Sequence, residues 1–255
     1  MDQLIRKTIS DFTSTYRHRD HLGWKSPRVA YAWADDPLFA TLKQVASPTH
    51  ALPQDFLAEA RTVITYFLPF HDEVVESNRS GRFSSKAWAE AYIETNKSIG
   101  ALNQHLQGVL IENGCKAAFV PATHNFDKNT LQSDWSHRSA AYIAGLGTFG
   151  LNHMLITESG CCGRIGSLIT DLELPPTPRY KQELCLNKAD GSCGRCAKKC
   201  VNGALKEEGL DKQKCYEMCL NNADLLGDLE SIADVCGKCL VGVPCSTTVP
   251  SSQVV

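Results

Sequence analysis

The stretch SCGRCAKKCV, residues 192–201, places three cysteines within eight residues. Cys193, Cys196 and Cys200 have the spacing of the last three ligands in a C-x2-C-x2-C-x3-C run, which is typical of iron–sulfur proteins. Asp190 stands where the first cysteine of such a run would be. The stretch is therefore a cluster-binding run whose missing ligand comes from elsewhere, a zinc site, or a group of structural cysteines.

The whole chain of 255 residues contains twelve cysteines, nine of them between residues 185 and 245. In a reducing compartment, cysteines at such spacing indicate metal or redox chemistry rather than disulfides. We expect a cytoplasmic protein without membrane contact, because no apolar signal-peptide core is visible and the most apolar run, residues 63–70, is far shorter than the ~20 residues of a membrane span. Cys115, Cys161 and Cys162 are interpreted as ordinary small buried residues.

The nine clustered cysteines form two groups, separated by a helical spacer. In two-cluster ferredoxins, the fourth cysteine of each run ligates the other cluster. The same crossover here predicts two [4Fe–4S] clusters with four thiolates each. The predicted ligands are Cys185, Cys193, Cys196 and Cys245 for the first cluster, and Cys200, Cys215, Cys236 and Cys239 for the second. Cys219 is left over, four residues after Cys215 on the same helical face, and can exchange roles with it.

Zinc is the alternative to iron–sulfur clusters. Cys193 and Cys196, together with Cys236 and Cys239, would provide the four thiolates of a structural zinc site. That arrangement leaves four of the other clustered cysteines without a role, so the sequence favours two clusters.

The sequence outside the cysteine-rich tail predicts a layered α/β (α+β) domain. A proline-rich stretch at residues 175–180 divides the chain into a domain over residues 1–180 and a small module over residues 181–255. The net charge of −2 gives no general attraction to nucleic acid or to an anionic membrane.

Periodicity and capping signals predict the individual elements of this domain. Helices are expected over residues 1–20, 35–46 (opened by Pro37) and 86–114, with a short helix before residue 63 and another capped by Ser133 or Asp134 and ending at Gly145. Strands are expected over residues 27–34, 63–70, 115–122, 153–157 and 165–174. The polar residues 71–85 are interpreted as a loop that covers the site as a lid.

Gly145, Gly147 and Gly150 form a G-x-G-x-x-G pattern. The pattern follows a predicted helix and precedes a predicted strand, which is not the context of a dinucleotide-binding fingerprint. Three interpretations remain open: nicotinamide binding, a connection that needs positive φ angles, and a close approach of the backbone to a large flat cofactor.

The motifs AGLGTFGLNHMLIT, GSLITDLEL, CGRCAKKC, LDKQKCYEMCL and CGKC follow one another between residues 144 and 239. In this order they resemble the epoxyqueuosine reductases and, more distantly, the reductive dehalogenases. The resemblance implies a nitroreductase-like domain that binds base-off cobalamin, followed by a ferredoxin-like module with two [4Fe–4S] clusters. It also implies that Cys193, Cys196 and Cys245 hold the cluster nearer the corrinoid.

The resemblance further implies residues that bind the corrinoid and residues that supply a proton. Predicted corrinoid-binding residues are Gly145, Leu146, Gly147, Thr148, Phe149, Gly150, Asn152, His153 and Arg164. Predicted catalytic residues are Asp134, His137 and Tyr142, with His153 a further candidate for the proton donor. Arg138 and Arg164 are expected to pair with the corrinoid or with the substrate.

The implied function is a reductase that passes electrons through two clusters to cobalamin and so reduces an unidentified small-molecule or protein-bound substrate. A low-potential flavodoxin or ferredoxin is the expected donor. The alternatives are an epoxyqueuosine reductase acting on tRNA and a non-catalytic electron carrier that reduces another protein's corrinoid. We expect tRNA to be the weaker candidate, because the sequence has no strong basic patch and only ten residues follow Cys245.

Overall fold

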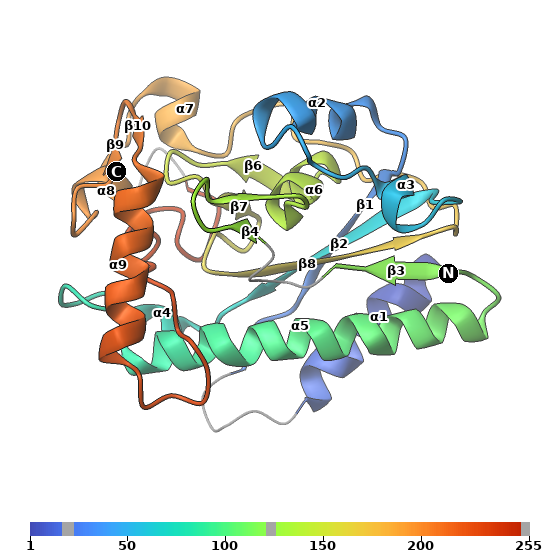
Figure 1. The fold of residues 1–255 in the computed structure, drawn as a ribbon, viewed down its shortest axis with the longest axis horizontal. Coiled ribbons are helices and arrows are strands. Elements are labelled where there is room, and N and C mark those ends of the chain that lie inside the picture. The colour runs from blue at the N-terminus through green and yellow to red at the C-terminus, as the bar shows by residue number, and fades with distance from the viewer. Residues whose placement is uncertain (17–22, 121–125, 251–255) are drawn as a thin grey trace.

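A four-stranded antiparallel sheet forms the centre of the computed structural model, which describes residues 1–16, 23–120 and 126–250. The strand order is β1-β2-β8-β3, with bounds Arg28–Trp33, Thr62–Pro69, Gly163–Thr170 and Ala117–Phe119 (Figure 1). Every residue of β2 is buried, because strands flank it on both sides and helices cover both faces of the sheet. The mixed α/β architecture predicted from the sequence is confirmed.

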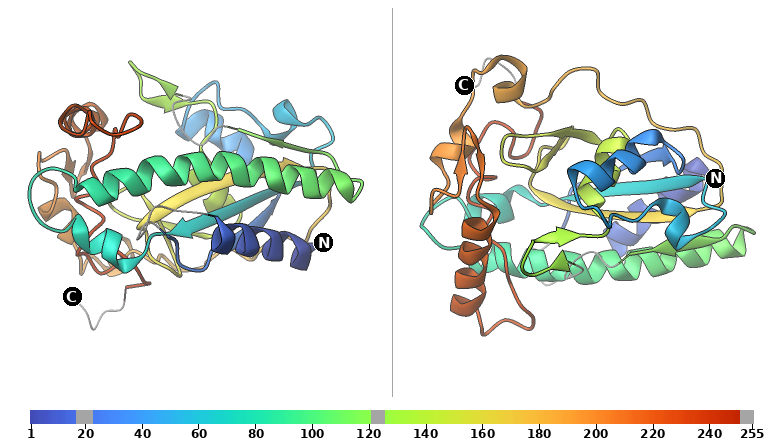
Figure 2. Two further views of the ribbon diagram at one scale, coloured as in Figure 1. Left: turned by 90° about the horizontal axis from the view of Figure 1, so that it is seen from below. Right: turned by 45° about the horizontal axis from the view of Figure 1, so that its top comes forward.

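Helices cover the two faces of the sheet (Figure 2). On one face lie α1 (Asp2–Thr15) and the long α5 (Lys86–Glu112); on the other lie α2 (Pro37–Val45), α3 (Pro53–Phe56) and α6 (His137–Ile143). Side chains of β2 alternate between the two apolar clusters, as the period of a strand requires. Ile64, Tyr66 and Leu68 pack toward α5, whereas Val63 and Phe67 pack toward α6.

Several helix ends form where the sequence predicts them. The Asp36 carboxylate caps α2 by accepting a hydrogen bond from Leu38 N at 3.0 Å, and Pro37 is the first helical residue. The long helix α5 ends at Glu112, and Gly114 follows with a φ of 79°. The helix predicted over residues 1–20 is α1, which ends earlier, at Thr15. Residues 17–20 of the predicted helix lie outside the described residues.

The predicted start of α6 is wrong. Its N-cap is Ser136, whose hydroxyl accepts a hydrogen bond from Ser139 N at 3.2 Å. Ser133 belongs instead to β5 (Gln132–Ser133), which pairs with β4 (Phe126–Asp127). The helix begins three residues later than the first candidate cap because Trp135 is buried in the core before the helix starts.

Residues 71–85 match the predicted loop only in part. They begin with α4 (Asp72–Ser77), whose Val74 and Val75 are buried, and residues 78–85 form a loop. Side chains after this helix hold the cysteine-rich part: Asn78 donates to Cys236 O at 2.9 Å, and Ser84 Oγ donates to Val235 O at 2.9 Å. Because this segment is fastened by hydrogen bonds and borders neither of the two cavities described below, it is a support for the cysteines rather than a lid.

Two predicted strands are longer than the observed ones, and one observed strand was not predicted. The strand expected over residues 115–122 is β3 (Ala117–Phe119), and residues 121 and 122 lie outside the described part. The strand expected over residues 153–157 is β7 (Leu155–Thr157). Its partner β6 (Gly147–Phe149) lies inside the glycine pattern, where no strand was expected.

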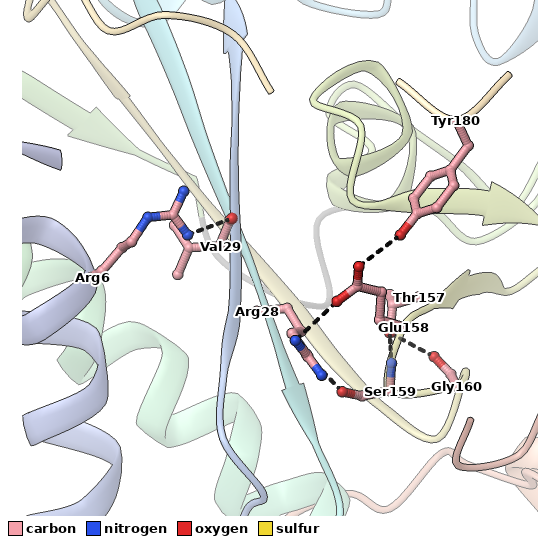
Figure 3. A network of polar contacts seen from close by, with 8 residues as sticks. All are labelled: Arg6, Arg28, Val29, Thr157, Glu158, Ser159, Gly160 and Tyr180. Carbon is pink, nitrogen blue, oxygen red and sulfur yellow. Dashed lines mark hydrogen bonds and ion pairs between the residues drawn. The ribbon is translucent and has the colours of Figure 1, made fainter. Parts of the chain in front are cut away.

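A polar network joins β1, the turn between β7 and β8, and Tyr180 in the segment that leads to the cysteine-rich part (Figure 3). Arg28 of β1 donates to Glu158 Oε2 at 2.9 Å and to Ser159 Oγ at 2.8 Å, and the Tyr180 hydroxyl donates to Glu158 Oε1 at 3.4 Å.

The cysteine-rich part that follows contains short elements and one longer helix. These are α7 (Leu186–Asp190), α8 (Arg195–Lys198), β9 (Leu205–Lys206), β10 (Gly209–Leu210) and α9 (Lys212–Leu225). No helix within the described ranges is both long and apolar enough to cross a lipid bilayer.

Candidate cofactor site

The first predicted group of cysteines comes together around one small cavity. Cys185, Cys193, Cys196 and Cys245 all border this space of about 20 Å³. Cys185 lies at the N-terminus of α7, and its Sγ accepts a hydrogen bond from Leu151 N at 3.4 Å. The ligand that the 192–201 stretch lacks therefore has a candidate at Cys185, as the sequence predicts.

The second predicted group borders a larger space, which we call the module cavity. Cys200, Cys215, Cys236 and Cys239 line this cavity of about 560 Å³, and Cys219 lines it too. The Sγ of Cys200 accepts a hydrogen bond from Leu205 N at 3.2 Å. The resemblance implies that the first group faces the corrinoid, but the second group is the one that borders the larger cavity.

The pKa values of the thiols report how closely the members of each group approach one another. Burial, with smaller contributions from Cys245, Cys185 and Cys193, raises the pKa of Cys196 to about 12. In the second group, a hydrogen bond from the Cys219 thiol lowers the pKa of Cys215 to about 7, and the same bond raises the pKa of Cys219. Cys219 therefore lies beside Cys215 on α9, as the i, i+4 spacing predicts.

The four cysteines of the zinc alternative are divided between the two spaces. Cys193 and Cys196 border the small cavity, whereas Cys236 and Cys239 border the module cavity. Over the described residues, no three His, Cys, Asp or Glu side chains approach closely enough to hold a single metal ion. Each group instead brings four thiols around a space, which is the number of anchors that a [4Fe–4S] cluster requires.

The surroundings of the second group also suit a sulfur-rich ligand. Trp88 is 2% exposed, borders the module cavity and has an indole Nε1 with no hydrogen-bond partner among the described residues. A Cβ on Gly237 would stand 2.4 Å from the Trp88 ring, so glycine lets the loop between Cys236 and Cys239 lie against the indole. A buried donor without a partner is costly unless a ligand accepts from it, so this one fits a bound cluster.

A second space, which we call the sheet cavity, lies over β8 and has a volume of about 460 Å³. Its lining includes Phe67, Trp135 and His137. Arg138 and Arg164 border both the sheet cavity and the module cavity, so the two spaces adjoin.

Among Asp134, His137 and Tyr142, only His137 borders a cavity; His153, the further candidate for the proton donor, borders the module cavity. His137 is 8% exposed, and its Nδ1 lies 2.8 Å from Ser167 Oγ. Trp135 Nε1 donates to the same hydroxyl at 3.0 Å. His50 fixes the start of the helix from the other side, because its Nε2 accepts from Ser136 N at 3.1 Å; burial lowers the pKa of His50 and favours this neutral form.

Asp134 and Tyr142, the other predicted catalytic residues, border neither the sheet cavity nor the module cavity. The Asp134 carboxylate accepts a hydrogen bond from the Thr49 hydroxyl, and its backbone carbonyl accepts from Ala51 N at 2.7 Å. Tyr142 is 39% exposed and lies 5.7 Å from the ring of Phe149. These contacts hold both residues outside the two spaces, and their catalytic roles stay predictions.

The predicted corrinoid-binding residues separate into two sets. Phe149, Asn152, His153 and Arg164 border the module cavity, and Gly150 borders the small cavity. Burial lowers the pKa of His153, with Arg138 contributing, so this ring favours the neutral form. Gly145, Leu146, Gly147 and Thr148 border none of these three spaces.

Two of the pattern glycines have reasons within the fold. Gly145 has a φ of 79°, which confirms the positive-φ interpretation at this position. A Cβ on Gly147 would stand only 2.0 Å from the Ile156 carbonyl oxygen, because β6 and β7 pair closely there. Glycine is therefore required at position 147 because the backbones of β6 and β7 approach each other closely there.

Several residues at the site had no signal in the sequence. Trp88 and Tyr92 come from the first turns of α5, far from the cysteines in the chain. Cys161, predicted to be merely buried, is 1% exposed and also touches the first group: its backbone N donates to Cys245 O at 2.9 Å, and it borders the sheet cavity. Only the tertiary structure brings these residues to the cysteines.

No protein-family model matches the chain, and no curated protein matches it. Solved structures resemble it in fold. An epoxyqueuosine reductase from Streptococcus thermophilus superposes with a TM-score of 0.58 at 16% sequence identity, covering 96% of this chain and 66% of that one. The chain thus spans about two thirds of the length of that protein.

Two further structures extend the comparison. The catabolic reductive dehalogenase NpRdhA, in complex with 3-bromo-4-hydroxybenzoic acid, gives a TM-score of 0.60 at 13% identity, over 98% of this chain and 37% of that one. An epoxyqueuosine reductase with a tRNA-Tyr stem loop gives 0.54 at 19% identity, over 87% and 58%. The resemblance predicted from the motifs is confirmed at the level of the fold, a mixed α/β arrangement with small sheets.

Proposed function

We propose that this chain is an iron–sulfur reductase that binds two [4Fe–4S] clusters and a base-off corrinoid, and that reduces a substrate in the space over β8. The proposal rests mainly on one observation: eight cysteines form two groups of four, and one group borders a large cavity that adjoins a second one. The nitroreductase-like and ferredoxin-like divisions at residue 180 are part of this proposal.

The residues of each space fit the proposed groups. Cys185, Cys193, Cys196 and Cys245 would hold the first cluster, and Cys200, Cys215, Cys236 and Cys239 the second. The module cavity offers aromatic walls, including Tyr92 and Phe149, and amide or cationic donors, including Asn152, to a large amphipathic ligand. When bound, the clusters supply one-electron transfer and the corrinoid supplies the low-potential metal centre, while the protein provides binding and orientation.

We assign the proton donor to His137. The contact with Ser167 holds the imidazole by Nδ1, and Trp135 holds the serine hydroxyl in turn. We assign the transferable proton to the other ring nitrogen, Nε2. His137 is buried beside the sheet cavity, so a proton delivered there is shielded from bulk water.

An external low-potential flavodoxin or ferredoxin is the proposed electron donor. A second candidate function is the reduction of epoxyqueuosine in tRNA, which is supported by the structural similarity to an epoxyqueuosine reductase with a bound tRNA stem loop. A third is a non-catalytic carrier that passes electrons to another protein's corrinoid.

A cobalamin titration of the anaerobically purified protein tests the proposal. We expect a saturable change to the absorption spectrum of base-off cobalamin, with about one cobalamin per chain. Binding followed by turnover without a second protein separates the reductase from the carrier. Absence of any spectral change under reducing conditions would contradict the corrinoid-binding proposal.

A further inference from the structure

Two arginines from different elements face the same space. Arg138 comes from α6 and Arg164 from β8, and both border the sheet cavity and the module cavity. Two guanidinium groups therefore lie where the two cavities adjoin.

Few contacts within the protein satisfy these two groups. Arg138 Nη1 donates to His153 O at 2.8 Å and lies 3.4 Å from Met154 Sδ. The Cζ of Arg164 lies 4.5 Å from the centroid of the Tyr92 ring, and its guanidinium makes no hydrogen bond to any described residue.

Neither guanidinium forms an ion pair within residues 1–16, 23–120 and 126–250. Asp234, an acid that also borders the module cavity, accepts a hydrogen bond from the Tyr92 hydroxyl at 2.7 Å. Other arginines of the chain do pair with carboxylates: Arg28 forms an ion pair with Glu158 at 2.9 Å, and Arg179 forms one with Asp36 at 2.6 Å.

The physical consequence is a positive charge in a partly enclosed space that is balanced only in part. Arginine stays protonated in proteins, so the charge cannot be removed by titration. Burial lowers the pKa of both groups, and Arg164 lowers that of Arg138 further; Cys215 offsets this in part for Arg138, as Tyr92 and Asp234 do for Arg164. An anion in this space would be stabilised by both groups, and a guanidinium fork matches a carboxylate or a phosphate.

We propose that Arg138 and Arg164 form an anion-binding subsite that holds the carboxylate or phosphate of a ligand with an apolar body. The apolar body would contact the aromatic walls of the sheet cavity, including Phe67 and Trp135. The inference deepens the proposed function by giving the chemical class of its ligand. The anion has two possible sources: the substrate, or the phosphate in the nucleotide loop of a bound corrinoid.

The test compares benzoate with the neutral benzamide as probes in calorimetric titrations of the anaerobically purified full chain. We expect benzoate to bind about tenfold more tightly than benzamide, as for a hydrogen bond to a charged group. Arg164→Gln and Arg138→Gln should each remove most of this difference. Arg28→Gln is the matched control and should leave it unchanged, because Arg28 is already paired with Glu158.

Repeating the titrations with cobalamin bound separates the two sources of the anion. Benzoate binding that persists assigns the subsite to the substrate, whereas competition with cobalamin assigns it to the corrinoid phosphate. Equal binding of benzoate and benzamide to the wild-type protein would overturn the inference, as would unchanged benzoate binding in both variants. If one variant fails to fold, as judged by circular dichroism, the other still decides.

The proposed function can fail separately from this inference. A protein that binds no cobalamin but retains the arginine-dependent preference for benzoate contradicts the function and leaves the subsite standing. A protein that binds cobalamin but shows no preference does the reverse.

Discussion

The sheet part of the molecule, residues 1–174, and the cysteine-rich part, residues 181–250, are stabilised in different ways. The sheet has two extensive apolar clusters, one on each face, built from helices and strands. The cluster that lies within the cysteine-rich part has only Cys196, Leu205 and Val243 as buried members. The rest of this part is held against the sheet part: Leu240 and Val241 join one of its apolar clusters, Ala233 packs on α5, and Asn78 donates a hydrogen bond to Cys236 O.

The two parts therefore depend on different sources of folding free energy. A small module buries too little apolar surface to be stable by itself and usually requires metals or disulfides. All twelve cysteines are free thiols, and eight of them surround two spaces. We infer that ligand binding at the cysteines is part of the folding free energy of this part, as in other metal-dependent modules.

Removal of iron should therefore have the largest effect, and only in one part of the molecule. After anaerobic treatment with a chelator, backbone amides of α9 and residues 236–245 should lose most of their protection from hydrogen exchange. Amides of β2 and α5 should keep theirs, because apolar packing holds them. Exchange followed by mass spectrometry measures both regions at once, and uniform loss across the chain would contradict the division.

Substitution of single cysteines should separate the two groups. Cys196→Ser and Cys236→Ser should each lose about half of the iron, the four atoms of one cubane. Cys236→Ser should also disturb cobalamin binding, because only its group borders the module cavity. Iron analysis and absorption titration are the measurements.

Cys219→Ser is the matched control for these two variants, since Cys219 lies beside Cys215 but is not one of the eight proposed ligands. It should retain nearly all of the iron. A loss of half the iron in Cys219→Ser, with retention in Cys215→Ser, would exchange the roles of the two residues.

Gly147→Ala should destabilise the sheet part by about 1–3 kcal/mol, as other overpacked sites do. The added methyl would meet the Ile156 carbonyl oxygen. Gly108→Ala on α5 is the control, because nothing lies within 4 Å of its Cβ position; it should be stabilising by about 1 kcal/mol. Urea unfolding gives both values. If the Gly147→Ala protein is as stable as wild type, packing within the fold does not require this glycine, and a close approach to a cofactor becomes the better explanation.

The smallest expected effect concerns the unpartnered indole of Trp88. Trp88→Phe removes a donor beside the second cysteine group while retaining an aromatic ring, so the midpoint potential of one cluster should become more negative. Trp24→Phe is the control, since its Nε1 donates to Thr95 Oγ1 at 2.9 Å. A redox titration followed by electron paramagnetic resonance measures the shift. Identical midpoint potentials in wild type, Trp88→Phe and Trp24→Phe would show that Trp88 donates no hydrogen bond to a cluster.

The grouping of the cysteines could be predicted from the sequence because the chemistry of a cluster fixes their number and spacing. Cys185 is the cysteine that precedes Cys193 and Cys196 in the chain, and the crossover of two-cluster ferredoxins assigned Cys245 to the same group; all four border the small cavity. The buried strand β2 could be predicted for a similar reason, since a continuous apolar run has few alternatives.

The start of α6 and the lining of the cavities could not be predicted in this way. Ser133, Asp134 and Ser136 are all good capping residues, and the burial of Trp135 decides between them. Trp88 and Tyr92 reach the module cavity from α5, far from the cysteines in the sequence, so no local pattern marks them. The need for glycine at position 147 has no local signal either, because it comes from the Ile156 carbonyl across the β6–β7 pair.

Iron and acid-labile sulfide analysis of the anaerobically purified full chain tests the central claim most directly. We expect about eight irons and eight sulfides per chain, four for each group of cysteines. Zinc at one or two atoms per chain, with no sulfide, would contradict it.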